Sequence, residues 1–414
     1  MKNFWKKLTL IMSLVILTLP LFTSTVQADS NSTFDLSANA GMAFDENTGQ
    51  IIYSKNADKK VAIGSITKIV TLYLVTKALK EKQFTQQDTL APTQEQADMT
   101  EDSELTNVRL DTDKSYTVEE LYKAAWIVSS NSAAMMLADK VSGSQKKFVK
   151  LMRKTLKDWG IKDAEIYNVS GLNNSDLKPD MYLGAKDGEN KLSTNDIGVI
   201  VKHVLDQFPE ILKTTSIAKF EFPYENETKT YDSLNLLLKG NRDYQAGYEF
   251  DGLKTGTTNQ AGESFVGTLP MNGTRIVTIV MGASGEKSDV DKRFRSAQKL
   301  AQDVKDNYEH KETLKKGQKI KIHKKEYKIN QPVYVWVPKN SNVENLSYNE
   351  SSNDLGFTAT HKKQTVKLIA ANTASGYLPF KKADVKKVIH KKTSQKSWWD
   401  PIVDFFNNLI KRLF

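Results

Sequence analysis

The chain has 414 residues, of which 39% are hydrophobic, and this is enough apolar sequence for one large core or two ordinary ones. It contains no cysteine, which excludes a disulfide framework, a thiolate nucleophile and a cysteine-ligated zinc. The formal net charge is +10, but residues 301–396 hold 20 basic and 9 acidic residues, whereas residues 29–300 are net acidic. The basic segment favours an anionic surface such as a membrane as its partner, and no motif for nucleic acid accompanies it.

The first 28 residues have the pattern of a signal peptide. Three lysines precede an apolar run over residues 8–22, and residues 26–28 supply small side chains at the usual cleavage spacing. The run is too short for a membrane-spanning helix and contains Pro20. We therefore expect export and a mature chain that begins at Asp29.

Residues 29–308 predict a sheet interrupted by a long helical insertion. Residues 40–54 alternate apolar and polar side chains about a turn at 47–49, which indicates a hairpin, and Asn272-Gly273 is typical of a second one. Further strands are expected at 252–258, 263–268 and 275–281, and helices at 69–75, 117–126, 133–138, 146–159, 196–208 and 290–308. Sheet and helices in layers make an α/β sandwich.

Beyond residue 309 the pattern changes to short strands. Residues 319–322, 333–337 and 365–370 alternate apolar and polar side chains, as strands do, and polar turns separate them. We therefore expect a small all-β domain over 309–392. Residues 398–414 place aromatic and aliphatic side chains at helical spacing, with charged and amide side chains on the other face. This favours an amphipathic helix on a membrane surface, and a helix docked on the β domain or a dimer contact remains an alternative.

Ser65 and Lys68 form the first candidate for chemistry. The spacing Ser-x-x-Lys occurs five more times, at Ser144, Ser175, Ser216, Ser284 and Ser296, so it proves little by itself. Ser65 differs because it follows a glycine and opens an apolar helix that would bury the lysine. Residues three apart share one helix face, which brings the amine within reach of the hydroxyl.

Burial would make Lys68 a usable base. A solvated lysine is protonated at neutral pH, but desolvation and nearby positive charge lower its pKa by several units. Of the five histidines only His203 lies inside the first domain, on what looks like an ordinary helix. A Ser-His-Asp triad would need His203, so lysine is the preferred base.

Two further motifs follow. Ser129-Ser130-Asn131 is a Ser-x-Asn pattern, which also fits a capped helix end. Lys254-Thr255-Gly256 occurs once, on a predicted strand, where it would otherwise be an exposed pair on an edge.

In chain order, the three motifs resemble those of penicillin-binding proteins and serine β-lactamases. Within that superfamily the sequence is similar to low-molecular-weight D-alanyl-D-alanine carboxypeptidases, with support from residues 168–172 and 252–258. The resemblance implies a β-lactamase/transpeptidase-like α/β (α+β) catalytic domain. The expected organisation is a signal peptide (1–28), the catalytic domain (29–308), a small β-rich domain (309–392), and a linker with an amphipathic anchoring helix (393–414).

The resemblance also implies catalytic roles. Ser65 would attack the carbonyl of the penultimate D-alanine of a peptidoglycan stem peptide and release the terminal D-alanine. Lys68 would accept the serine proton, and Ser129 would relay a proton to the leaving amine. β-Lactams would inhibit the protein covalently, at the outer face of the bacterial cytoplasmic membrane. No metal or cofactor is implied.

Substrate-binding roles follow in the same way. Asn131 would orient the substrate amide, and Lys254 with Thr255 would bind the terminal carboxylate. Gly256 would let the substrate backbone approach the strand. The N–H groups of Ser65 and Thr257 would form an oxyanion hole.

Two departures and two alternatives remain. Family members often have Pro-Ala before the nucleophile, where this chain has Ile63-Gly64, and some carry histidine at the position of Thr257.

A serine β-lactamase would share the motifs, yet the Glu-x-x-x-Asn pattern is missing because Asn168 stands only three residues after Glu165. A non-catalytic wall-binding protein would not need the Ser-Lys pair.

Overall fold

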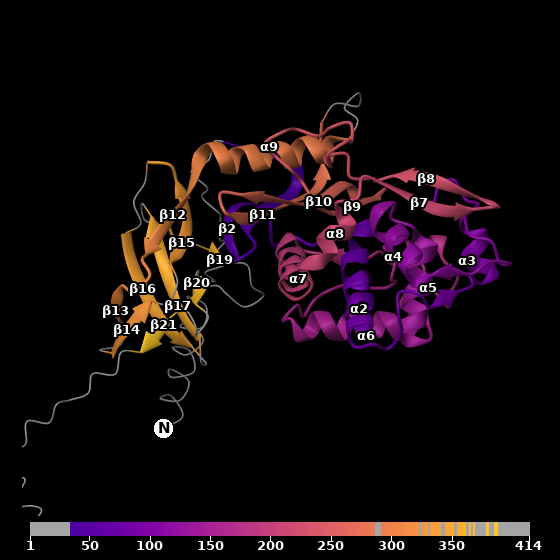
Figure 1. The fold of residues 1–414 in the computed structure, drawn as a ribbon, viewed down its shortest axis with the longest axis horizontal. Helices are drawn as coiled ribbons and strands as arrows, with labels where there is room; N and C mark the ends of the chain where they lie inside the picture. Colours follow the sequence, from indigo (N-terminus) through magenta and orange to yellow (C-terminus); the bar gives the residue numbers. More distant parts are fainter. Residues whose placement is uncertain are drawn as a thin grey trace, which may run out of the picture. The chain divides into compact units, whose positions relative to one another are not determined.

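The computed structural model describes most of the chain from Phe34 onward (Figure 1). The described residues are 34–285, 291–322, 325–329, 332–340, 344–351, 354–361, 364–365, 367–368, 378–380 and 385–387. The expected signal peptide (1–28) and the expected linker and amphipathic helix (393–414) lie outside these residues.

An antiparallel sheet forms the frame of the catalytic region, with strand order β19-β2-β1-β11-β10-β9. Its strands are β1 (Ala38–Asp45), β2 (Gln50–Lys55), β9 (Gly252–Thr258), β10 (Gly262–Met271), β11 (Thr274–Ala283) and β19 (Lys367–Leu368). Both predicted hairpins are confirmed. Asn272 and Gly273 have φ of 49° and 78°, the left-handed pair that a two-residue hairpin turn requires.

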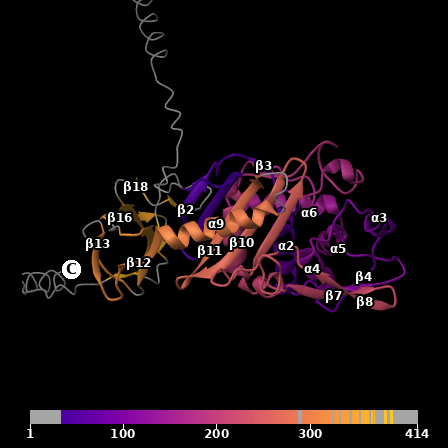
Figure 2. The same cartoon turned by 90° about the horizontal axis from the view of Figure 1, so that it is seen from above.

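Alternate side chains of the central strand β11 enter two different cores. Val277, Ile279 and Met281 pack into the core on the side of the large helical region, while Ile276 and Val280 pack on the other side. Helix α9 (Lys292–Asn307) covers that second side and crosses β10 and β11 (Figure 2). This helix matches the one expected over 290–308 closely, and the layered sandwich is confirmed.

The insertion between β2 and β9 is mainly helical. Its helices are the 3-10 turns η1 (Gly64–Thr67), η2 (Asn174–Asp176) and η3 (Pro209–Ile211), with α2 (Lys68–Lys80), α3 (Gln94–Asp98), α4 (Val118–Ile127), α5 (Asn131–Ser142), α6 (Gln145–Asp158), α7 (Thr194–Gln207) and α8 (Leu212–Thr215). The capping box predicted at Thr117 is present, since its side chain accepts from the N–H of Glu120.

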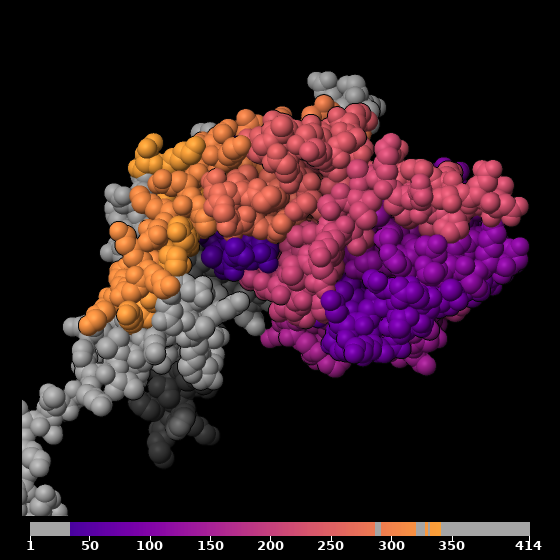
Figure 3. Space-filling model, viewed as in Figure 1, coloured from indigo at the N-terminus to yellow at the C-terminus, as the bar shows by residue number. Residues whose placement is uncertain are grey.

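Short strands complete the insertion. They are β3 (Val61–Ala62), β4 (Thr89–Leu90), β5 (Tyr116–Thr117), β6 (Lys191–Leu192), β7 (Lys219–Tyr224) and β8 (Glu227–Asp232). The β7–β8 hairpin was not expected from the sequence. It lies against the helical region (Figure 3). Phe222 of β7 stacks there on Tyr116, with ring centroids 5.3 Å apart.

The described residues after α9 are mainly strands. They are β12 (Tyr308–Leu314), β13 (Lys319–Ile322), β14 (Lys325–Ile329), β15 (Val333–Pro338), β16 (Glu344–Ser351), β17 (Asp354–His361), β18 (Gln364–Thr365), β20 (Leu378–Phe380) and β21 (Val385–Lys387). Instead of one strand over 365–370, the structure has β18 and β19, and β19 pairs with β2. No helix of the described residues is long and apolar enough to cross a membrane.

Candidate active site

The turn that carries Ser65 begins at a glycine and runs directly into a buried helix. Gly64 has a φ of 50°, a conformation that favours glycine. Ser65 is half-buried in η1, and Lys68 is the first residue of α2. Ser65 therefore lies in a 3-10 turn that leads directly into the apolar helix expected after it. Because α2 is apolar on nearly every face, Lys68 is 0% exposed.

The Lys68 amine lies within hydrogen-bond distance of three oxygens. Its Nζ is 2.9 Å from Ser65 Oγ, 2.6 Å from Asn131 Oδ1 and 2.8 Å from the carbonyl oxygen of Ser170. Burial lowers the pKa of Lys68 well below its ordinary value, and the charge of Lys254 lowers it further. Both effects shift the protonation equilibrium of Lys68 toward the neutral amine.

In the neutral form of Lys68, these contacts direct the lone pair of the amine to the Ser65 hydroxyl. A neutral amine has two hydrogens and one lone pair, whereas a carbonyl oxygen only accepts. Asn131 Oδ1 and the Ser170 carbonyl take the two hydrogens, which leaves the lone pair for the Ser65 hydroxyl. The predicted Ser65–Lys68 pair is brought together in the geometry of a hydroxyl and its general base.

Ser129 and Asn131 enter the site from the junction of α4 and α5. Ser129 has a φ of 63°, an uncommon left-handed conformation, and Ser130 caps α5 with its side chain. Asn131 donates from Nδ2 to the carbonyl of Thr106 at 3.0 Å, which fixes its amide so that Oδ1 faces Lys68. Asn131 therefore orients the base, a role that the sequence resemblance did not indicate.

Lys254 lies on the edge strand β9 but is only 2% exposed, so the alternative of a solvated edge lysine is wrong. Its Nζ donates to Ser129 Oγ at 2.8 Å and to the Thr255 carbonyl at 3.2 Å. Burial, followed by the charge of Arg293, lowers the pKa of Lys254 to about 7. Lys254 thus gives up its proton more easily than an ordinary lysine, and its amine contacts Ser129 directly.

The start of β9 is fixed by an ion pair. Asp251 accepts from Arg275 Nη1 at 2.7 and 2.8 Å and from the hydroxyl of Thr268. At the other end, β9 touches the nucleophile turn. A methyl group on Gly256 would lie 2.7 Å from the carbonyl of Ile63, and one on Gly64 would lie 3.1 Å from the nitrogen of Thr257. The backbones that carry the N–H groups of Ser65 and Thr257 are therefore in close contact.

Arg293 belongs to the site and was missed in the sequence. From the beginning of α9, its Nη1 donates to the Gly256 carbonyl at 3.2 Å and to Thr257 Oγ1 at 2.8 Å. Its Nε lies 3.6 Å from Glu263 Oε2. No local pattern marks this arginine, because only the packing of α9 on the sheet brings it to β9.

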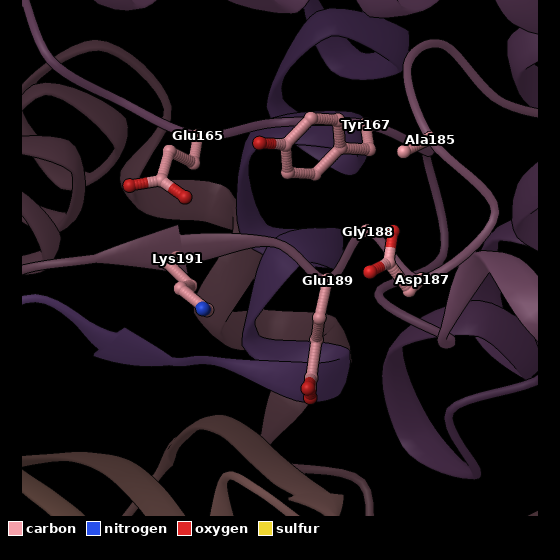
Figure 4. Close-up of a pocket in the computed structure, with 7 residues that line it drawn as sticks. All are labelled: Glu165, Tyr167, Ala185, Asp187, Gly188, Glu189 and Lys191. Carbon is pink, nitrogen blue, oxygen red and sulfur yellow. The ribbon is translucent and has the colours of Figure 1, made fainter.

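The two residues that would have supported other chemistries lie elsewhere. His203 stacks on Trp159 with ring centroids 4.6 Å apart, and burial lowers its pKa. Glu165 pairs with Lys60 at 3.0 Å and lines a cavity of about 220 Å³, where its carboxylate and that of Asp187 point in from opposite sides (Figure 4). Within the described part of the chain, no group of acidic or histidine side chains could hold a metal ion.

Several known proteins are similar to this chain in sequence and structure. D-alanyl-D-alanine carboxypeptidase DacF of Bacillus subtilis is 28% identical over 251 residues, which are 60% of this chain and 58% of DacF. The chain thus spans less than two thirds of the length of the curated relatives it first matches. The structure of a peptidoglycan synthesis regulatory factor (PBP3) from Streptococcus pneumoniae is similar with a TM-score of 0.72 and 31% identity, covering 86% of this chain and all of that one.

A third similarity is to a penicillin-binding protein of Listeria monocytogenes in its cefotaxime-bound form, with a TM-score of 0.54, 28% identity, and coverage of 66% of this chain and 98% of that chain. The fold is thus that of penicillin-binding proteins, with a half-buried serine and a buried lysine between its helical region and the edge of its sheet. The chain belongs to the D-alanyl-D-alanine carboxypeptidase family, whose profile matches residues 24–285.

Proposed function

We propose that this protein is a serine D-alanyl-D-alanine carboxypeptidase that removes the terminal D-alanine from cell-wall stem peptides. The observation that carries the proposal is the Lys68 amine, fully buried and held between Ser65 Oγ and two carbonyl acceptors. A binding module of the same fold would have no use for a desolvated lysine beside a serine, because burying it costs free energy.

Acylation follows from the contacts. Ser65 Oγ bonds to the carbonyl carbon of the penultimate D-alanine as its proton passes to Lys68 Nζ. The charge that develops on the carbonyl oxygen meets the N–H groups of Ser65 and Thr257. The C–N bond then breaks as Ser129 gives its proton to the leaving amine, and the proton that Lys68 took from Ser65 restores the Ser129 hydroxyl, to which Lys254 donates a hydrogen bond. Water hydrolyses the resulting ester and frees the shortened peptide.

Positive charge on and beside β9 suits a substrate that ends in a carboxylate. Lys254 and Thr255 lie on the strand, and the Arg293 guanidinium contacts Thr257. β-Lactams mimic such a peptide end and would acylate the same serine. The cefotaxime-bound form of the Listeria monocytogenes relative supports this inference.

The decisive experiment compares two substrates with the unmodified protein. A pentapeptide ending in D-alanyl-D-alanine should release free D-alanine, while nitrocefin should acylate the protein and turn over slowly. Rapid nitrocefin turnover without D-alanine release would favour a β-lactamase instead. The pairing of Glu165 with Lys60 argues against that second function.

Exchange of Arg293 for glutamine is expected to shift the pH dependence of kcat/KM. Burial lowers the pKa of Lys254 to about 7 and the arginine charge adds to this lowering, so removal of the charge raises that pKa. If protonated Lys254 attracts the carboxylate, activity declines as pH rises through its pKa, and the alkaline limb should move to higher pH. Arg295→Gln, on an exposed site of the same helix, is the control. An unmoved alkaline limb in Arg293→Gln contradicts this prediction.

We further propose that the protein works at the outer face of the cytoplasmic membrane. The patterns of residues 1–28 and 397–414, both outside the described residues, support this location. Removal of 397–414 should release the protein from membranes in fractionation while D-alanine release continues. Retention of the shortened protein on membranes would refute the anchor.

A further inference from the structure

Asn190 joins the turn that carries Ser65 to the loop that carries Ser170. The residue is 0% exposed. Its side-chain Nδ2 donates to Thr67 Oγ1 at 2.9 Å and to the Asn168 carbonyl at 3.0 Å. Its backbone carbonyl accepts from the N–H of Ile63 at 3.1 Å. One residue thus binds both ends of the nucleophile turn.

The same side chain also fixes the neighbouring loop. Asn190 Oδ1 accepts from the N–H of Tyr167 at 2.6 Å and from that of Asn168 at 3.3 Å. Asn168 Oδ1 in turn accepts from the N–H of Gly171 at 2.7 Å. The loop that contains Ser170 is therefore tied to Asn190 on one side and to its own backbone on the other.

The two segments are pressed together without space between them. Gly171 has a φ of 87°, and a methyl group there would lie 1.9 Å from the carbonyl oxygen of Gly64. Because the contact is between backbones, a small displacement of the loop changes the position of the Ser170 carbonyl relative to Lys68.

We propose that Asn190 is a positioning residue for the general base: it holds the Ser170 carbonyl as the second acceptor of Lys68 and so directs the amine's lone pair to Ser65. The proposal rests on the serine–lysine chemistry proposed above. Without Asn190, the Ser170 carbonyl is free to move away, and a hydrogen of the amine has no fixed partner. The lone pair then points at Ser65 for only part of the time.

A looser loop also admits water to Lys68. Burial is the main cause of the low pKa of Lys68, so added water raises that pKa toward its ordinary value. Lys254 on β9 is the charged group that acts on Lys68 from a neighbouring element, and a change at Asn190 leaves it in place. The base form of Lys68 would then appear only at higher pH.

The test measures the acylation of Ser65 by a fluorescent penicillin in Asn190→Ala, by stopped flow across a range of pH. We expect a rate about 10 to 100 times lower at neutral pH, since a misplaced catalytic group has effects of this size. The acid limb of the rate should move to higher pH. Thermal unfolding of the same samples gives the folded fraction.

Controls separate positioning from lost stability. Gln145→Ala removes another buried amide, which bonds the Met135 carbonyl, and should leave the acid limb unchanged. Thr67→Val keeps the side-chain shape but removes the hydroxyl that Asn190 contacts, and should slow acylation about 2- to 10-fold. This second variant decides the question if Asn190→Ala does not fold.

A wild-type acylation rate in folded Asn190→Ala overturns the inference. The inference also fails if the unfolded fraction accounts for the whole loss of acylation rate and the acid limb stays at its original pH. If Asn190→Ala does not fold, a wild-type rate in Thr67→Val overturns it. If the unmodified protein forms no adduct at Ser65, the proposed function fails first, so the two failures are distinguishable.

Discussion

Ser65→Ala is expected to abolish both the covalent adduct with a labelled penicillin and the release of D-alanine. The reason is that Ser65 is the serine beside the buried Lys68 amine. In four of the other five Ser-x-x-Lys pairs the lysine is exposed, namely Lys147, Lys178, Lys219 and Lys299, and Lys287 of the fifth lies outside the described residues. These lysines lack the burial that sets Lys68 apart.

Ser144→Ala is the matched control for this experiment, since Ser144 has the same spacing to Lys147 at the start of α6. Gel fluorescence measures the adduct, and an amino-acid assay measures free D-alanine. The control should behave as the unmodified protein does. An adduct that persists in folded Ser65→Ala would disprove the assignment of the nucleophile.

Lys68→Met is expected to slow the acylation of Ser65 about 100- to 10,000-fold, the usual contribution of a general base. Methionine fills the space of the lysine stem but offers no lone pair to the Ser65 hydroxyl. It also leaves Asn131 Oδ1 and the Ser170 carbonyl without their donor, so unfolding should be measured alongside. Lys147→Met is the control in an exposed pair.

The pH dependence makes this second prediction more specific. The pKa of Lys68 is well below its ordinary value, so the neutral base is present once the pH exceeds that lowered pKa. Acylation in the unmodified protein should rise as pH increases through it, and this rise should be lost in Lys68→Met. A retained rise would mean that another group accepts the proton.

Local patterns in the sequence predicted the elements that depend on local physics. The strand expected at 252–258 has the same bounds as β9, and the capping box at Thr117 begins α4 as expected. The buried setting of Lys68 also followed from its sequence, because the apolar run after it leaves no solvated face.

Long-range contacts could not be predicted in this way. Arg293 and Asn190 reach the site only because α9 and the segment before α7 pack where they do. The bond from Asn131 to Lys68 joins residues on different helices. In each case a common polar residue gains its role from tertiary placement, and a single sequence carries no local signal for that placement.

The order of strands in the sheet has a consequence for how the chain folds. β1 lies in the middle of the sheet, and its Ala38 pairs with Ala283 of β11. The first strand of the described chain therefore pairs with one of the last strands of the catalytic region. Contacts between such distant residues make folding slow. A chain synthesised from its amino terminus can complete this sheet only after β11 has been made. The site joins Lys68 of α2 and Ser129 to Lys254 of β9, so it is complete only after most of the catalytic region has been made.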